Sequence, residues 1–308
     1  MAGVSSIRAG AQSPTPSPSP AQQASFRDSA IQSGASTVHF ARQAARVGDE
    51  VEQSVSLEMR LTTLVRQQNQ VLDQTKTTMR VMQRRAVTTT EVEAGRITAV
   101  AVRYLEATKQ LTASGNAAAS EPSPPTAQPV QGKAYRCRRE AGDGGRLVIT
   151  DEQGQTPPAE EHEIVAQNME MIGRNNPLAD FLAGQSIAVG QTIALPKDVA
   201  ERLFNLGERF GEVQRFDLTL EEASVEEGTP CALFRAHVEA ASNDSSQMRM
   251  EVAGPLVVQV DTCRSVRTSL SGPIGMSETR GSYSVARQLI GTGQLNMSIA
   301  SRYRDTAR

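Results

Sequence analysis

A long run of alternating apolar and polar residues, Met248 to Asp261, is the feature that most limits how this chain can fold. Apolar side chains hold one parity of the run, interrupted only by Gly254, and charged or amide side chains are frequent on the other. A period of two residues sends the two sets to opposite faces of a β-strand, so one face meets a core and the other meets water. The run therefore predicts one strand of a large antiparallel sheet, which bends, bulges or lies at an edge where Pro255 removes a backbone donor.

The same alternation recurs along the chain between residues 51 and 299. Short segments rich in Gly, Asn, Asp and Pro separate the runs, which favours antiparallel neighbours, and about ten strands are expected. Two amphipathic helices are also expected, one after Pro158 and one from Asp198 to Phe210. The predicted fold class is mainly β, as one large curved antiparallel meander sheet or two β halves, with two packed helices.

Composition divides the 308 residues into parts. Residues 1–32 are rich in Ser, Pro, Ala and Gln, which predicts a disordered tail. A β-rich domain is expected over 33–304 and a short tail over 305–308, with a Pro/Ala/Ser-rich disordered loop at 113–131. The chain as given begins without the apolar region of a signal peptide, and no apolar run reaches the roughly 18 residues that span a bilayer.

The balance of charge argues against nucleic acid as a partner. Thirty-two basic and thirty-four acidic residues give a net charge of -2, which offers no general attraction for a polyanion. Trp is absent, and seven Phe with four Tyr supply few rings on which bases can stack. The basic pair Arg84-Arg85 and the group Arg136, Arg138 and Arg139 are expected on solvated faces of strands.

Residues that carry catalysis or bind metals are scattered in this sequence. His39, His162 and His237 have no second ligand at the spacing of a metal site, and His237 is expected to have a solvated cross-strand partner. No Gly-x-Ser-x-Gly sequence surrounds a serine, and the Gly-rich turns lack the Lys and helix of a phosphate loop. The sequence therefore predicts no catalytic, cofactor-binding or metal-binding residues and no cofactor.

Cysteine spacing raises the alternative of a disulfide. Cys231 begins one strand and Cys263 follows the strand that returns beside it, so both lie at the same end of the sheet. A Cys231–Cys263 bridge is geometrically feasible there and implies an oxidising compartment, whereas buried reduced thiols are the alternative. Cys137 stays unpaired in either case.

Several motifs occur in an order that resembles a known group of proteins. Val47-Gly48-Asp49 precedes the first long strand, Asp-Glu-Gln-Gly ends a hairpin at 151–154, and Leu270-Ser271-Gly272 lies in the closing meander. Over residues 47–304 this order is similar to an uncharacterised family of bacterial exported β-rich proteins and lipoproteins of the planctomycete type. The resemblance implies an extracytoplasmic location, in the periplasm or cell envelope, and assigns no catalytic residue.

Three functions are consistent with this sequence. The first is a non-enzymatic exported module that is tethered by the disordered N-terminal tail and acts in the cell envelope by binding or scaffolding, with an envelope protein as its possible partner. The second is a carrier of an apolar ligand in a groove between the curved sheet and the helices. Met248, Met250 and Met297 motivate the carrier because thioethers adapt to irregular ligands, although ordinary core packing also explains them. A hydrolase is the third, and only the presence of Ser, His and Asp supports it.

Overall fold

The computed structural model describes residues 36–68, 70–115, 123–141, 145–204, 211–242, 246–280 and 286–304. The two tails expected to be disordered, 1–32 and 305–308, lie outside these residues. The helices and strands are β1 (Thr37–His39), β2 (Glu50–Gln67), β3 (Gln70–Glu93), β4 (Arg96–Gly115), β5 (Thr126–Ala127), β6 (Ala134–Arg139), β7 (Leu147–Asp151), α1 (Ala159–Asn168), α2 (Pro177–Leu182), β8 (Ser186–Ala188), β9 (Thr192–Ala194), α3 (Lys197–Phe204), β10 (Glu212–Glu226), β11 (Thr229–Ala241), β12 (Ser246–Gln259), β13 (Ser265–Arg280) and β14 (Arg287–Arg304).

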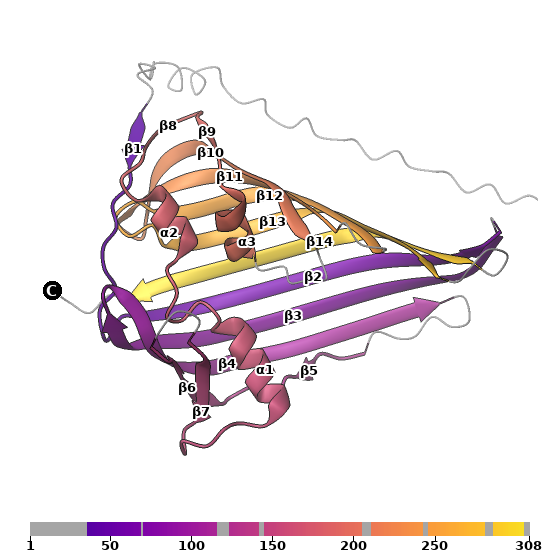
Figure 1. Cartoon of the computed structure of the whole chain (residues 1–308), viewed down its shortest axis with the longest axis horizontal. Coiled ribbons are helices and arrows are strands. Elements are labelled where there is room, and N and C mark those ends of the chain that lie inside the picture. The colour runs from indigo at the N-terminus through magenta and orange to yellow at the C-terminus, as the bar shows by residue number, and fades with distance from the viewer. Residues whose placement is uncertain are drawn as a thin grey trace, which may run out of the picture. The chain divides into compact units, whose positions relative to one another are not determined.

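Twelve strands form one antiparallel sheet (Figure 1). Its order is β7-β6-β4-β3-β2-β14-β13-β12-β11-β10-β9, and β5 pairs with β4 outside this path. The sheet is open, with β7 and β9 at the two ends of the order, while β1 and β8 form a separate pair. The prediction of a mainly β fold with a large antiparallel sheet and few helices is confirmed.

The alternating run that begins at Met248 forms most of β12, which lies between β11 and β13 inside the sheet. Its apolar parity is buried as predicted, and the buried members are Met250, Val252, Leu256 and Val258. No bridge to β13 forms at Gly254 or Pro255, although bridges form on both sides of them. The proline therefore interrupts the ladder as expected, but it does so within an internal strand and not at an edge.

Alternation divides the long strands into an inner face, which the helices partly cover, and an outer face that is mainly polar. The same division holds on neighbouring strands, because two residues that are paired across the sheet point their side chains to the same face. Leu57 on β2 is opposite Met297 on β14 and opposite Val81 on β3. All three side chains therefore lie on the inner face.

Three helices lie among the described residues, one more than predicted. Helix α1 follows Pro158 as expected, and α3 contains the first half of the second predicted helix, whose remainder at 205–210 lies outside the described residues. Helix α2 is the additional one. Asn176 caps it by accepting hydrogen bonds from the backbone N–H groups of Leu178 and Ala179, and Pro177 occupies its first position.

Two apolar cores pack on the inner face. The larger lies under α2 and α3 against β10 to β14, and Phe40, Leu218 and Phe234 are fully buried in it. The smaller lies under α1 against β4, β6 and β7, around Tyr104 and Val165. The helices are therefore packed onto the sheet by two separate apolar cores.

Residues 113–115 and 123–131 of the predicted loop 113–131 are described, and residues 116–122 lie outside the described residues. Strand β4 continues to Gly115, and β5 pairs with β4 at Thr108 and Lys109. Val130 is fully buried in the smaller core. The prolines are compatible with this arrangement because the segment follows β4 at the side of the sheet, where few ladder donors are required.

A buried carboxylate anchors α1 to the sheet. Glu161 is 7% exposed, and it accepts hydrogen bonds from Lys133 Nζ at 2.7 Å and from Tyr135 Oη at 2.6 Å. Burial alone would raise the pKa of Glu161, but the hydrogen bonds from Lys133 and Tyr135 outweigh it and hold the pKa below its usual range. The ionised form is therefore favoured in the folded protein.

Replacing Glu161 with glutamine is expected to lower the free energy of unfolding at pH 7 by about 1–3 kcal/mol, because charge-assisted hydrogen bonds are lost. The pKa of Glu161 is lower in the folded protein than in the unfolded chain. Its contribution to stability is therefore complete at a pH above the unfolded-chain pKa, and it is lost as the pH falls through the pKa of the folded protein. Urea unfolding of both proteins should therefore differ at neutral pH and converge at acidic pH. Glu163→Gln, on the same helix but exposed, is the control. A Glu161→Gln effect as small as that of the control would contradict the anchoring role.

Candidate functional site

A pocket of about 450 Å³ opens on the inner face between the two cores. Gln53 of β2, Arg85 of β3 and Val100 of β4 contribute to one wall. The facing walls come from residues 42–45, from the segment 168–179 that joins α1 to α2, and from the end of α3. The pocket therefore combines parts of the chain that are far apart in sequence.

Arginine is the charged residue of this pocket. Six arginines line it, and none of the described lining residues is Asp, Glu or Lys. Four of the six form ion pairs with carboxylates behind the lining, and these pairs are Arg42–Asp180, Arg174–Glu170, Arg202–Asp198 and Arg264–Asp49. The remaining two, Arg85 and Arg96, form no ion pair with a described residue. The lining consequently carries positive charge next to apolar side chains such as Met169 and Ile172.

Arg85 is the most deeply buried of these arginines and is only 8% exposed. It lies on the inner face between Gln53 on β2 and Tyr104 on β4, its partners in register. Its Nε and Nη2 both donate to Oε1 of Gln53, at 3.0 and 2.5 Å. Its Nη1 is buried and donates no hydrogen bond. The expectation that Arg84-Arg85 is solvated is therefore wrong for Arg85, because adjacent strand residues face opposite sides.

The surroundings of Arg85 are polar but uncharged. Burial lowers the pKa of Arg85, and neighbouring Tyr104 acts in the opposite direction. Burial raises the pKa of Tyr104, so its neutral phenol is favoured at neutral pH. Asn168 of α1 donates to the hydroxyl of Tyr104 at 3.0 Å and to Oε1 of Gln83 at 3.0 Å. These contacts hold the wall of the pocket in place, but they bring no negative charge to the guanidinium.

The Val47-Gly48-Asp49 motif forms another part of the pocket's support. Asp49 is 7% exposed and its Oδ2 lies 3.1 Å from Nη2 of Arg264. The guanidinium of Arg264 also lies over the ring of Tyr303, 5.2 Å from its centroid. Gly48 adopts a φ of 91°, a left-handed conformation that glycine takes without strain. The motif thus has a structural role in orienting Arg264 at the pocket.

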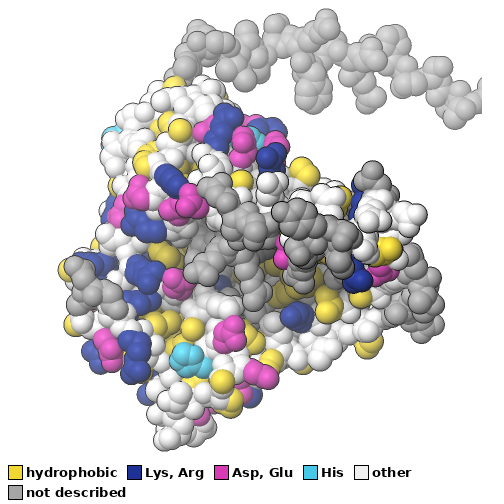
Figure 2. All heavy atoms as spheres, turned by 45° about the vertical axis from the view of Figure 1, so that its right-hand side comes forward, with side chains coloured by type: hydrophobic (Ala, Val, Ile, Leu, Met, Phe, Trp, Pro, Cys, Tyr) yellow, Lys and Arg dark blue, Asp and Glu magenta, His cyan; other side chains and the backbone are white. Residues whose placement is uncertain are grey.

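An apolar strip continues from this pocket along β2. After Gln53, the next four inward positions are Val55, Leu57, Met59 and Leu61, and all four are only partly buried. Leu111 of β4, opposite Met79 on the same face, is 54% exposed. In Figure 1 the helices lie over one end of the long strands, which continue beyond them. Hydrophobic side chains are visible in the hollow of the face that comes forward in Figure 2.

The three methionines predicted for an apolar groove all lie on this inner face. Met250 is 3% exposed and belongs to the larger core, so its role is packing. Met248 and Met297 are partly buried. Met297 lies directly opposite Leu57 of the strip. Packing therefore accounts for Met250, and Met297 also packs against the larger core, although it is only partly buried.

The cysteines and histidines are not brought together. Cys137, Cys231 and Cys263 are buried free thiols in this structure, which corresponds to the second of the two alternatives for Cys231 and Cys263. Burial raises the pKa of Cys137 to about 12 and that of Cys263 to about 11, and Cys263 Sγ donates to the carbonyl of Ala41. The described residues contain no group of three or more His, Cys, Asp or Glu that could hold a metal ion.

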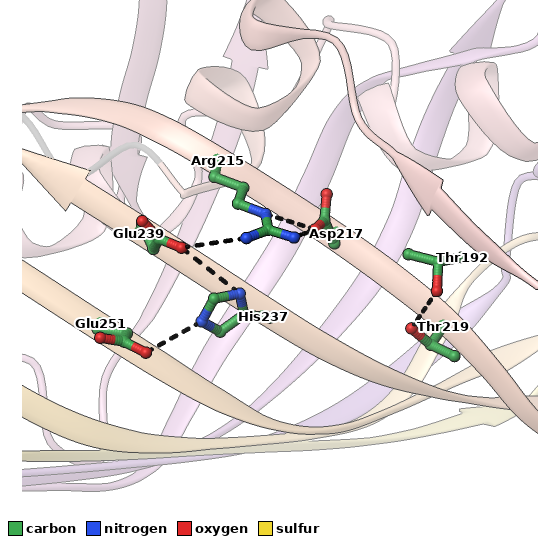
Figure 3. A network of polar contacts seen from close by, with 7 residues as sticks. All are labelled: Thr192, Arg215, Asp217, Thr219, His237, Glu239 and Glu251. Carbon is green, nitrogen blue, oxygen red and sulfur yellow. Dashed lines mark hydrogen bonds and ion pairs between the residues drawn. The ribbon is translucent and has the colours of Figure 1, made fainter.

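His237 lies on the outer face of β11, as its parity predicts (Figure 3). Its Nε2 is 3.2 Å from Oε1 of Glu251 on the neighbouring β12. Arg215 of β10 completes this exposed network through Asp217 and Glu239. These cross-strand contacts match the predicted solvated partner, and the network lies on the face opposite the pocket.

Comparisons with known proteins add only distant likenesses. The sequence matches no family model and no curated protein. The structure of lipovitellin, described in a study of its lipid–protein interactions, is 8% identical with a TM-score of 0.35, over 84% of this chain and 26% of that one. The translocator domain of the autotransporter NalP from Neisseria meningitidis is 10% identical with a TM-score of 0.17, over 81% and 88%. The chain thus spans about a quarter of the lipovitellin chain, and neither likeness is close enough to carry an argument.

The protein is an open antiparallel sheet with a helical layer over part of one face, and the pocket lies between the sheet and this layer. Among the described residues, none of the helices has the length and apolar composition needed to cross a membrane.

Proposed function

We propose that this protein binds and carries an elongated apolar ligand on the inner face of its open sheet. The observation that supports this most directly is the partly exposed apolar strip on β2, together with Leu111 on β4. Apolar side chains this extensive on one face favour burial against another apolar surface. A bound ligand provides that surface without any change of the fold.

Dimensions support a chain-like ligand. From Gln53 at the pocket to Leu61 at the far end of the strip, β2 advances by eight residue steps, or about 26 Å at the usual rise of a strand. The neighbouring strands add Val81 and Met79 on one side and Met297 on the other, so the strip is several strands wide. A long acyl chain has a comparable length and would contact side chains from three strands.

The scaffolding hypothesis stays a prediction, as do the extracytoplasmic location and the resemblance to exported β-rich proteins. Scaffolding requires a protein partner, whose surface is not defined by the contacts of the described residues. The carrier hypothesis instead has a defined surface and therefore a direct test. A carrier in this sense requires binding and release only, without catalytic residues.

The full chain is expected to bind cis-parinaric acid, a long-chain fatty acid that fluoresces in apolar surroundings. Leu111→Asp should weaken this binding about tenfold or more, because the chain loses an apolar contact and meets a carboxylate. Leu111 is already exposed, so the substitution should leave folding intact. Fluorescence titration measures the Kd in each case. Thr112→Asp, on the adjacent outward position of β4, is the control and should bind as the unmodified chain does.

Two results would count against the proposal. One is the absence of saturable binding by the full chain. The other is an equal loss of binding in Leu111→Asp and Thr112→Asp, which would indicate a general effect of added negative charge and not contact with the inner face.

A further inference from the structure

The positive charge of Arg85 is buried without a compensating carboxylate. The guanidinium has five N–H donors, and its contacts with Gln53 use only Nε and Nη2. Nη1 makes no hydrogen bond although it is shielded from solvent. Burying a cation in this way is unfavourable unless an anion compensates it. A buried, strongly perturbed ionisable group in a cleft is a candidate for a functional site.

The surrounding pocket favours an anion over any other ligand group. Among its described lining residues the only charged side chains are arginines, and two of the six, Arg85 and Arg96, have no ion-pair partner among those residues. Arginine recognises carboxylate and phosphate oxygens through its planar fork of donors. A cation placed there would be repelled by Arg85 and Arg96, whose charges no described carboxylate compensates.

The pocket lies at one end of the apolar strip. Gln53, which holds Arg85, is two residues from Val55, the first residue of the strip on β2. On β3, Val81 and Met79 lie on the same inner face as Arg85, closer to the start of the strand. From Arg85 to Met79 the distance along the strand is about 20 Å. One ligand can therefore place an anionic end at Arg85 and an apolar chain on the strip.

We propose that the pocket around Arg85 binds the carboxylate or phosphate group of an anionic amphiphile, whose negative charge compensates the guanidinium of Arg85. This inference rests on the proposed function, because the apolar chain of the same ligand lies on the strip. Arg85 selects the charged end, and Arg96 contributes positive charge at the more exposed side of the pocket.

The test compares cis-parinaric acid with its methyl ester, which keeps the chain and removes the charge. The full chain should bind the acid about 10- to 100-fold more tightly, the range expected for hydrogen bonds to a charged group. Arg85→Met should abolish this preference by weakening acid binding to the level of the ester. Arg84→Met is the matched control, since Arg84 is adjacent on the outer face and pairs with Glu52. It should keep the full preference.

Further measurements separate the outcomes. Equal affinity of the unmodified chain for acid and ester would overturn the anion site while leaving the carrier intact, and this comparison requires no variant to fold. Binding of neither compound would overturn the carrier. Inorganic phosphate and acetate test the pocket without a chain. Thermal stabilisation by either anion that disappears in Arg85→Met, without binding of the acid, would keep the anion site and overturn its connection to an apolar chain.

Discussion

Gly272→Ala is expected to lower the free energy of unfolding by about 4 kcal/mol or more, which is exceptional for the addition of one methyl group. A Cβ at position 272 would lie 1.9 Å from the backbone oxygen of Glu251 on β12. A backbone atom cannot move aside as a flexible side chain can, so β12 and β13 would have to separate. Urea unfolding followed by far-ultraviolet circular dichroism measures the effect.

Gly275→Ala provides the control on the same strand. A Cβ at position 275 would meet nothing closer than the oxygen of Gly291 at 3.9 Å, an ordinary contact. Its effect should remain within about 0.5 kcal/mol, since alanine also restricts the unfolded chain. Similar stabilities of the two variants would show that β12 and β13 do not approach each other closely at Gly272.

Phe40→Ala is expected to cost about 3–5 kcal/mol, the range for removing a fully buried aromatic side chain. Phe40 is inaccessible to solvent, and its ring stacks on that of Phe234 with centroids 5.8 Å apart. The following residue, Ala41, donates its N–H to the carbonyl of Val260. Phe40 therefore fixes the segment that continues into the pocket at Arg42, and its loss should loosen that wall as well.

Val47→Ala is the control for this prediction, because Val47 lies in the same segment and is 58% exposed. Its effect on the free energy of unfolding should stay within about 0.5 kcal/mol. A Phe40→Ala protein as stable as the Val47→Ala protein would mean that the segment contributes little to the larger core.

The sheet was predictable because its signal is local. Alternation of apolar and polar residues is visible within a single strand, so β12 and its neighbours could be identified without knowledge of their partners. Helix α2 was missed because Asn176 and Pro177 are typical of both loops and helix starts. For the described parts of the segment 113–131, composition does not reveal that β4 extends to Gly115 and pairs with β5.

The pocket was less predictable for a physical reason. Arg85 was assigned to a solvated face because it is charged and follows Arg84, although it shares the parity of Met79, Val81 and Val87. Greater weight on parity would have placed it on the inner face. The other walls come from residues 42–45 and from the segment 168–179, and no local pattern brings these together. Only the packing of helices on the sheet encloses the site.

The position of β14 next to β2 has a consequence for how the chain is made. These two strands pair along their whole lengths, although β2 lies near the start of the described chain and β14 at its end. Each of the meanders β2–β4 and β10–β14 can pair locally, whereas their union must wait until the last strand has been synthesised. The apolar strip of β2 consequently gains its neighbours on β14 only after all the other described strands have been synthesised. Until then, a growing chain on the ribosome would leave that side of the strip exposed.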